Sequence, residues 1–128
     1  MPRRRISSGS PYEASVGCSR AVVVGDRIVT SGTAPIWPDG SCDPDVTVQT
    51  RRCLDIILAA LAEGGATPAD VIRTRMYLAD ARDADAVARV HGEVFGSIRP
   101  ATTMVVVAAL VDPRSGLEIE AEAIAGSA

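Results

Sequence analysis

Residues 99–125 read RPATTMVVVAALVDPRSGLEIEAEAIA, a pattern that indicates two β-strands joined by a turn. The first predicted strand, Ala101 to Ala109, is uncharged and rich in Val and Thr, which is typical of a strand buried on both faces. Residues 112–116, DPRSG, have turn chemistry. In the second predicted strand, Leu117 to Ile124, apolar residues alternate with acidic ones, so the acidic side chains should share one face. The acidic residues are Glu118, Glu120 and Glu122.

The remaining residues predict the other elements of the same domain. Segments in which apolar and polar residues alternate predict strands, and segments in which apolar residues recur every three to four positions predict helices. The expected elements are an irregular arm over residues 1–16 with a short edge strand near Ile6, strands from Ser19 to Val24, Arg27 to Ser31 and Val71 to Ala79, and helices from the N-cap Asp43 to about Glu63 and from Asp83 to about Phe95. This order predicts one α+β domain, 1–128, with two helices on one face of a mixed sheet.

The sheet face away from the helices is expected to be polar but not uniformly so. Arg73, Arg75 and Tyr77 alternate with apolar residues, so they should lie on the same face as the glutamates. A small protein seldom leaves a sheet face to water unless that face is strongly polar. We therefore expect another subunit to cover it, and a closed ring of identical chains is the simplest arrangement.

Composition narrows the class of protein. The chain has 128 residues, a net charge of -3 and 47% hydrophobic residues, which argues against general binding to nucleic acid. No apolar run approaches the roughly 20 residues that cross a bilayer, and no apolar segment follows the basic N-terminal residues. Three cysteines without paired spacing fit a reducing compartment, and a single histidine argues against a Cys/His metal site. The sequence predicts a cytoplasmic protein without metal or membrane partner.

Several short motifs, in a specific order, resemble the RidA/YjgF family, also called L-PSP endoribonucleases. They are SRAV at 19–22, VGD at 24–26, TSG at 30–32, AEGG at 62–65, YLAD at 77–80 and PATT at 100–103. The resemblance covers nearly the whole chain. It implies a chorismate-mutase-like fold and a homotrimer with a cleft between neighbouring subunits. It also implies hydrolysis of reactive 2-imino acids or enamines to 2-keto acids and ammonia, with no cofactor.

The chain departs from the family pattern at three positions. Deaminase members carry a substrate-binding arginine where this chain has Thr102, a tyrosine where it has Cys18, and an asparagine where it has Ala88. Glu120, which matches a cleft acid of the family, and Gly32 are retained. Losing a charge-assisted hydrogen bond costs roughly 1.5–3 kcal/mol. Either another cation replaces the arginine, or the substrate differs, or deaminase activity is weak or absent.

Arg75 is the candidate to replace the missing charge, although Arg73 and Arg75 could instead neutralise the glutamates across the sheet. A positioned carboxylate can orient water or transfer a proton. The expected catalytic residue is therefore Glu120, and the expected ligand-binding residues are Arg75, Thr102, Ala101, Gly32 and Cys18. Cys18 is expected to line the cleft as a neutral thiol, and His91, on a predicted buried helical face, to be a core residue.

Three functions are compatible with these residues. The first is deamination of a small imine or enamine. The expected binding partner is then a small molecule that carries a carboxylate or an imine group. The second is a non-catalytic, regulatory protein that binds a small metabolite in the same cleft, a reading that Thr102 favours. The third is a ribonuclease, which rests on the older family label and which the acidic charge and lone histidine oppose.

Overall fold

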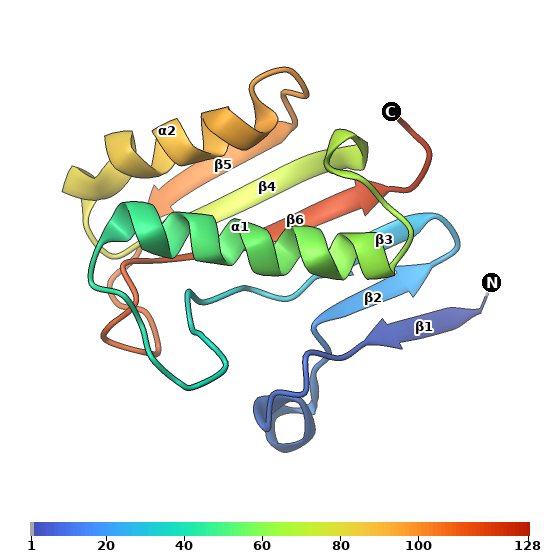
Figure 1. Cartoon of the computed structure of the whole chain (residues 1–128), viewed down its shortest axis with the longest axis horizontal. Coiled ribbons are helices and arrows are strands. Elements are labelled where there is room, and N and C mark those ends of the chain that lie inside the picture. Colours follow the sequence, from blue (N-terminus) through green and yellow to red (C-terminus); the bar gives the residue numbers. More distant parts are fainter. Residues whose placement is uncertain (1) are drawn as a thin grey trace.

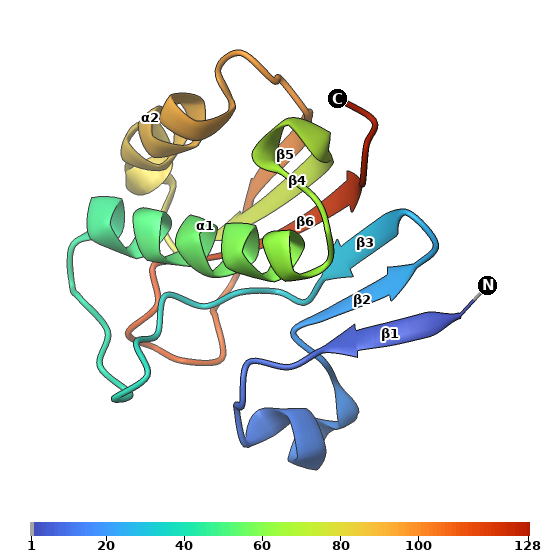
Figure 2. The same ribbon diagram turned by 45° about the vertical axis from the view of Figure 1, so that its right-hand side comes forward.

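The computed structural model describes residues 2–128 and has one six-stranded sheet in the order β1-β2-β3-β6-β4-β5. The strands are β1 (Arg3–Ile6), β2 (Ala21–Val24), β3 (Arg27–Thr30), β4 (Val71–Leu78), β5 (Ala101–Val106) and β6 (Leu117–Ile124), and the long helices are α1 (Val46–Glu63) and α2 (Ala84–Phe95). β4 and β5 run parallel, whereas the other neighbouring strands are antiparallel. Both helices cover the same face of the sheet (Figures 1 and 2). The expected α+β class is thus confirmed.

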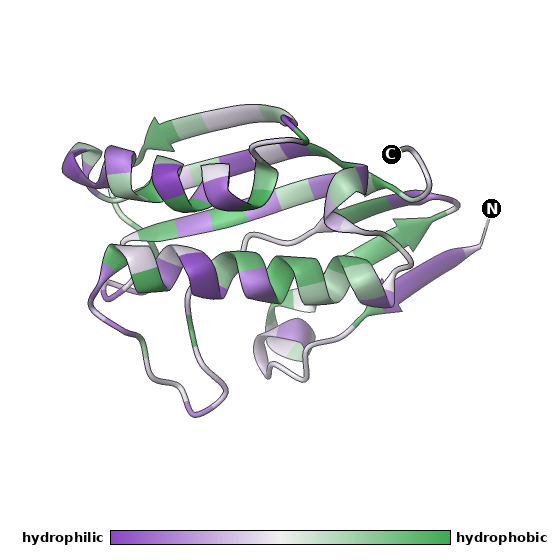
Figure 3. Cartoon of the chain, turned by 45° about the horizontal axis from the view of Figure 1, so that its top comes forward, coloured by the Kyte–Doolittle hydropathy of each residue, from purple (hydrophilic) through white to green (hydrophobic). Residues whose placement is uncertain are grey.

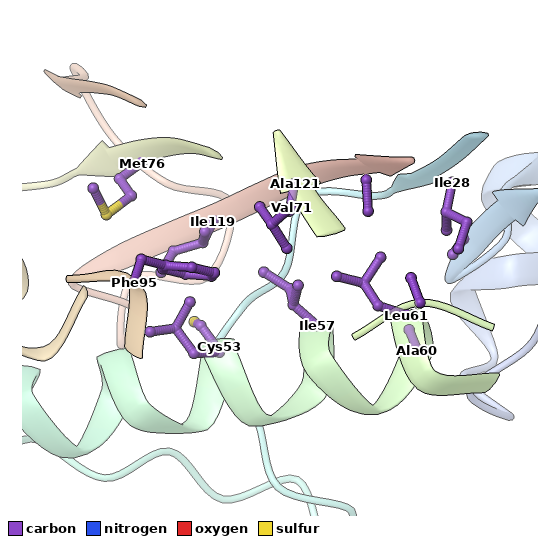
Figure 4. Close-up of a cluster of buried hydrophobic side chains, with 14 of the residues drawn as sticks. Ile28, Cys53, Ile57, Ala60, Leu61, Val71, Met76, Phe95, Ile119 and Ala121 are labelled. Carbon is purple, nitrogen blue, oxygen red and sulfur yellow. The ribbon is translucent and has the colours of Figure 1, made fainter. Parts of the chain in front are cut away.

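The central strand β6 organises the core, as its alternating sequence predicts. Leu117, Ile119, Ala121 and Ala123 face the helices and are at most 2% exposed, whereas the glutamates face the other way. The hydropathy alternates accordingly along the central strands (Figure 3). Ile119 and Ala121 of β6 lie above Cys53 and Ile57 of α1 (Figure 4). Phe95 of α2 belongs to the same cluster and lies beside Ile119. Burying one such aliphatic side chain contributes about 1.5–3 kcal/mol.

Helix α1 begins two residues later than the sequence predicts. Its N-cap is Asp45, whose carboxylate accepts hydrogen bonds from the backbone N–H groups of Thr47 at 2.7 Å and Val48 at 3.3 Å. The expected cap, Asp43, accepts instead from the N–H of Asp45 at 2.8 Å. Asp43 therefore forms a turn that leads into the helix, a role that suits the same side chain.

Strand β5 is shorter and more exposed than expected. It ends at Val106 rather than at Ala109, and it lies at the edge of the sheet, where it pairs with β4 alone. Most of its residues are exposed, so the prediction of a strand buried on both faces is wrong for the single chain. The run of Val and Thr reflects β-propensity, which does not determine whether a strand is central or at an edge.

The two edges of the sheet differ in chemistry. The edge strand expected near Ile6 is β1, which carries Arg3, Arg4 and Arg5, whereas β5 has no charged residue. The rest of the N-terminal arm is not wholly irregular, because residues Glu13–Gly17 form a short π-helical turn. Within residues 2–128, no helix is long and apolar enough to cross a membrane.

Candidate functional site

The open face of the sheet carries the polar residues that the sequence places there. Across the β4–β6 ladder, Arg73 lies opposite Glu122, Arg75 opposite Glu120, and Tyr77 opposite Glu118. Exposed valines flank this polar band on both sides: Val24 and Val29 from β2 and β3, and Val105 from β5. The face thus mixes charge with apolar surface.

Arg75 pairs diagonally with a glutamate rather than with its direct neighbour. Its Nη1 lies 3.5 Å from Glu122 Oε1, and the other oxygen of this carboxylate is 2.8 Å from Arg27 Nη2. Within residues 2–128, Arg73 forms no ion pair. Arg75 therefore neutralises a glutamate in this structure, yet its side chain keeps 38% of its surface exposed on the open face.

Glu120 is held by a tyrosine. The Tyr77 hydroxyl donates a hydrogen bond to Glu120 Oε1, and this bond raises the pKa of Tyr77. The hydrogen bond stabilises the neutral phenol because the carboxylate can accept only while the hydroxyl keeps its proton. The pair fixes the Glu120 carboxylate on the open face, a role that the sequence did not assign to Tyr77.

Arg20 positions the turn that contains Gly32. One of its guanidinium nitrogens, Nη2, donates to the carbonyls of Ser31 at 2.7 Å and Gly32 at 3.1 Å, and to Thr33 Oγ1 at 2.7 Å. Burial lowers the pKa of Arg20. Arg20 is part of the SRAV motif at 19–22, which by itself predicts no role for this side chain. A lone arginine at the start of an apolar strand is the signal that could have found it.

Gly32 lies against an acidic side chain of β6. A Cβ at this position would lie 2.9 Å from Glu118 Oε1, so any larger residue would have to displace that carboxylate. The next residue, Thr33, bridges to Ile119, which places the turn directly beside β6. Gly32 and Glu120 thus belong to the same region of the sheet.

Thr102 lies elsewhere. It pairs with Thr74 in the β4–β5 ladder and shares the helix-covered face with it, whereas Glu120 is on the open face. The Thr102 hydroxyl contacts the Thr74 hydroxyl, which also contacts His91 of α2. His91 is only partly buried, and this burial lowers its pKa. Ala101 lies on the open face opposite Arg73.

The expected site residues therefore form two groups in one chain. Gly32 lies with Arg75 and Glu120 at the centre of the sheet, and the exposed Cys18 lies just before β2. Thr102 lies on β5 and faces the helices, two strands from Glu120 on β6, which corresponds to about 10 Å across the sheet at ~4.8 Å a strand. No three His, Cys, Asp or Glu side chains within residues 2–128 are grouped so as to hold a metal ion.

A family model described as Endoribonuclease L-PSP matches residues 9–125. The chain belongs to the RidA/YjgF family. A crystal structure of a Mycobacterium tuberculosis member of the YjgF/YER057c/UK114 family superposes on this RidA/YjgF chain with a TM-score of 0.88 and 45% identity, covering 96% of this chain and 99% of that one.

Two curated relatives of this RidA/YjgF protein are informative. An uncharacterized Streptomyces coelicolor protein is 44% identical over 127 residues, covering 97% of this chain and 93% of its own. The 2-iminobutanoate/2-iminopropanoate deaminase of Escherichia coli K12 is 33% identical over 110 residues, covering 83% of this chain and 84% of its own.

Proposed function

We propose that this protein hydrolyses small 2-imino acids, or their enamine forms, to 2-keto acids and ammonia, as a cofactor-independent cytoplasmic homotrimer. One observation carries the proposal. This protein is related to an imine deaminase, and its Glu120 carboxylate accepts a hydrogen bond from Tyr77 on the open face of the sheet. A fixed carboxylate beside an uncovered surface is suited to general base catalysis.

The two groups of site residues favour a cleft between subunits. In one chain, Thr102 and Glu120 lie on opposite faces of the sheet, with β4 between their strands, so one small ligand cannot contact both. The exposed edge of β5 and the exposed valines of the open face are surfaces that a neighbouring copy would cover. If one copy places its β5 edge against the open face of the next, both groups meet at one ligand. A closed ring repeats this contact without leaving a free end.

In the proposed reaction, Glu120 accepts a proton from water as the water oxygen adds to the imine carbon. Glu120 passes this proton to the nitrogen, which gives a carbinolamine. It then takes the proton of the new hydroxyl group and delivers it to the nitrogen as the carbon–nitrogen bond breaks, so the 2-keto acid and ammonia leave and Glu120 is ionised again. Arg75, on the same face, supplies positive charge near the developing intermediate. The Gly32 turn, fixed by Arg20, presents its backbone to the ligand beside β6, with Ala101 and Cys18 at the margins of the cleft.

Thr102 distinguishes this protein from the deaminases with an arginine at that position. Its hydroxyl offers one neutral hydrogen bond to a substrate carboxylate instead of a charge-assisted pair, a loss of roughly 1.5–3 kcal/mol. This substitution also favours the second candidate function, a protein that binds a small carboxylate without turning it over.

The proposal is tested by incubating the purified protein with freshly generated 2-iminobutanoate and 2-iminopropanoate and following imine loss. Turnover faster than buffer, abolished by Glu120→Gln, is the expected result. Saturable binding of 2-oxobutanoate without any acceleration would favour the binding protein. Light scattering should give three times the 13.3 kDa chain mass, and a monomer at micromolar concentration would contradict the inter-subunit cleft.

A further inference from the structure

Three side chains form a continuous hydrogen-bonded chain that crosses the helix-covered face of the sheet. Thr74 of β4 is completely buried, and its Oγ1 lies 2.8 Å from His91 Nε2 of α2. The same oxygen lies 2.9 Å from Thr102 Oγ1 on β5. Thr102 Oγ1 in turn lies 3.1 Å from the Pro100 carbonyl oxygen. Helix α2 lies on the same side of the sheet as α1, close to β5 and β4 (Figure 1), and these hydrogen bonds link it to both strands.

Counting the available protons shows which group donates in each of these hydrogen bonds. A carbonyl oxygen can only accept, so Thr102 donates its one hydroxyl proton to Pro100. Thr102 must then accept from Thr74, whose own single proton is thereby used. Thr74 must accept from His91, so Nε2 carries a hydrogen. Burial lowers the pKa of His91 and favours the neutral ring, in which Nδ1 then lacks a proton.

We propose that His91 and Thr74 are positioning residues that fix the Thr102 hydroxyl as a hydrogen-bond donor to the carboxylate of a small 2-keto or 2-imino acid. The inference rests on the proposed function because it places Thr102 at the ligand. When the ligand binds, the Thr102 proton turns from the Pro100 carbonyl to a carboxylate oxygen, while Thr102 continues to accept from Thr74. Each bond in such a chain polarises the next.

This arrangement explains how a threonine serves where related proteins have an arginine. A lone hydroxyl can donate or accept, so it does not by itself select an anion. Linked to a histidine that carries hydrogen on Nε2, the Thr102 hydroxyl keeps its proton available for an outward acceptor, whereas the opposite direction would leave it only lone pairs to offer. The site therefore always has a donor for a carboxylate oxygen, and the remaining lone pair of Thr102 can accept from a ligand N–H or O–H.

The direction of the hydrogen bonds from His91 to Thr102 can be measured without any ligand or turnover. His91 is the only histidine in the sequence, so selective ¹⁵N-histidine labelling gives one unambiguous set of ring signals. At neutral pH we expect a protonated Nε2 and an unprotonated Nδ1, unchanged when 2-oxobutanoate saturates the protein. The opposite tautomer would overturn the inference, because Thr102 would then be directed to accept.

Matched variants test the effect on the ligand, with calorimetric binding of 2-oxobutanoate as the readout. His91→Phe removes the donor and should weaken binding roughly tenfold, the range of one hydrogen bond. His91→Gln keeps an N–H near the position of Nε2 and should restore affinity to within about twofold. Thr74→Val and Thr74→Ser form a second pair with the same expected difference, because serine keeps the hydroxyl.

These results separate the inference from the proposed function. Equal affinity in His91→Phe and His91→Gln would overturn the positioning role even if the protein turns over 2-iminobutanoate. Absence of saturable 2-oxobutanoate binding to the wild type would refute the ligand step of the inference. Imine turnover with correct rescue by glutamine and serine would support both, whereas binding with rescue but no turnover would support the inference alone.

Discussion

Ile119 and Glu120 are adjacent in β6, yet they belong to two different environments. Ile119 is fully buried under the helices, whereas Glu120 lies on the open face and accepts a hydrogen bond from Tyr77. The helix-covered face holds the apolar core, and the open face holds unpaired or diagonally paired charges next to exposed valines. Because neighbouring residues point to opposite faces, stability and chemistry can be altered separately within one strand.

The largest change in activity should come from a substitution on the open face. Glu120→Gln keeps the shape of the side chain and an oxygen that can accept from Tyr77, but removes the base. We expect imine hydrolysis to fall about 10²- to 10⁴-fold, the usual contribution of a general base. The free energy of unfolding should change by no more than about 1 kcal/mol. Imine loss and urea unfolding, measured on the same preparation, test both statements, and undiminished turnover would remove Glu120 from the reaction.

The next effect should come from the neighbouring residue on the covered face. Ile119→Ala leaves a cavity in the core between β6 and α1, and we expect it to lower the free energy of unfolding by about 2–5 kcal/mol. Urea unfolding at fixed protein concentration measures this loss. The fraction that remains folded should keep its turnover number. If the free energy of unfolding falls by less than about 1 kcal/mol, the helix-covered face contributes less to stability than we infer.

A charge placed on the open face should weaken assembly more than folding. Val29 lies opposite Glu122, so the lysine of Val29→Lys can pair with that carboxylate in one chain but would be buried at a subunit contact. We expect the proposed trimer to dissociate at concentrations at least about tenfold higher than for the wild type. Val111→Lys, at a fully exposed loop position, is the matched control. Light scattering over a dilution series distinguishes them, and equal behaviour would place the contact elsewhere.

The smallest effect concerns pH on the covered face. His91 has a lower pKa in the folded chain than its ordinary value of 6.5, so the unfolded chain binds the proton first as pH falls. Stability should therefore be fully present above about pH 6.5 and decline as pH falls through the folded pKa. His91→Gln cannot titrate and should lose less stability between about pH 7.5 and about pH 5.5. Identical pH dependence in the two proteins would mean that His91 is not the group responsible.

The sequence predicts the two faces well because alternation is a local property. Each residue of β6 carries its own hydropathy, and the period of two assigns it to a face without knowledge of the rest of the chain. The start of α1 is harder to predict because Asp43 and Asp45 are both good capping residues. Only the turn made by Asp43 decides which of them begins the helix.

The site is harder to predict because its arrangement depends on long-range pairing. Thr102 and Thr103 are identical in chemistry, and only the register with Thr74 and Arg75 shows which of them faces the helices. The packing of α2 on β4 adds the contact of Thr74 to His91, a residue that the sequence predicts to be in the core. Arg20 and Tyr77 gained their roles in the same way, from partners 11 to 43 residues away along the chain.

The contrast between the two edge strands has a consequence for how the chain must be produced. Arg3, Arg4 and Arg5 make the β1 edge repel a second copy of itself, whereas the uncharged β5 edge offers free backbone groups to any extended segment. A chain newly released from the ribosome therefore exposes an aggregation-prone template, which in the proposed trimer stays open until another copy covers it. Rapid dilution during refolding would prolong that interval, and a lysine introduced at the β5 edge would act as a gatekeeper at the expense of assembly.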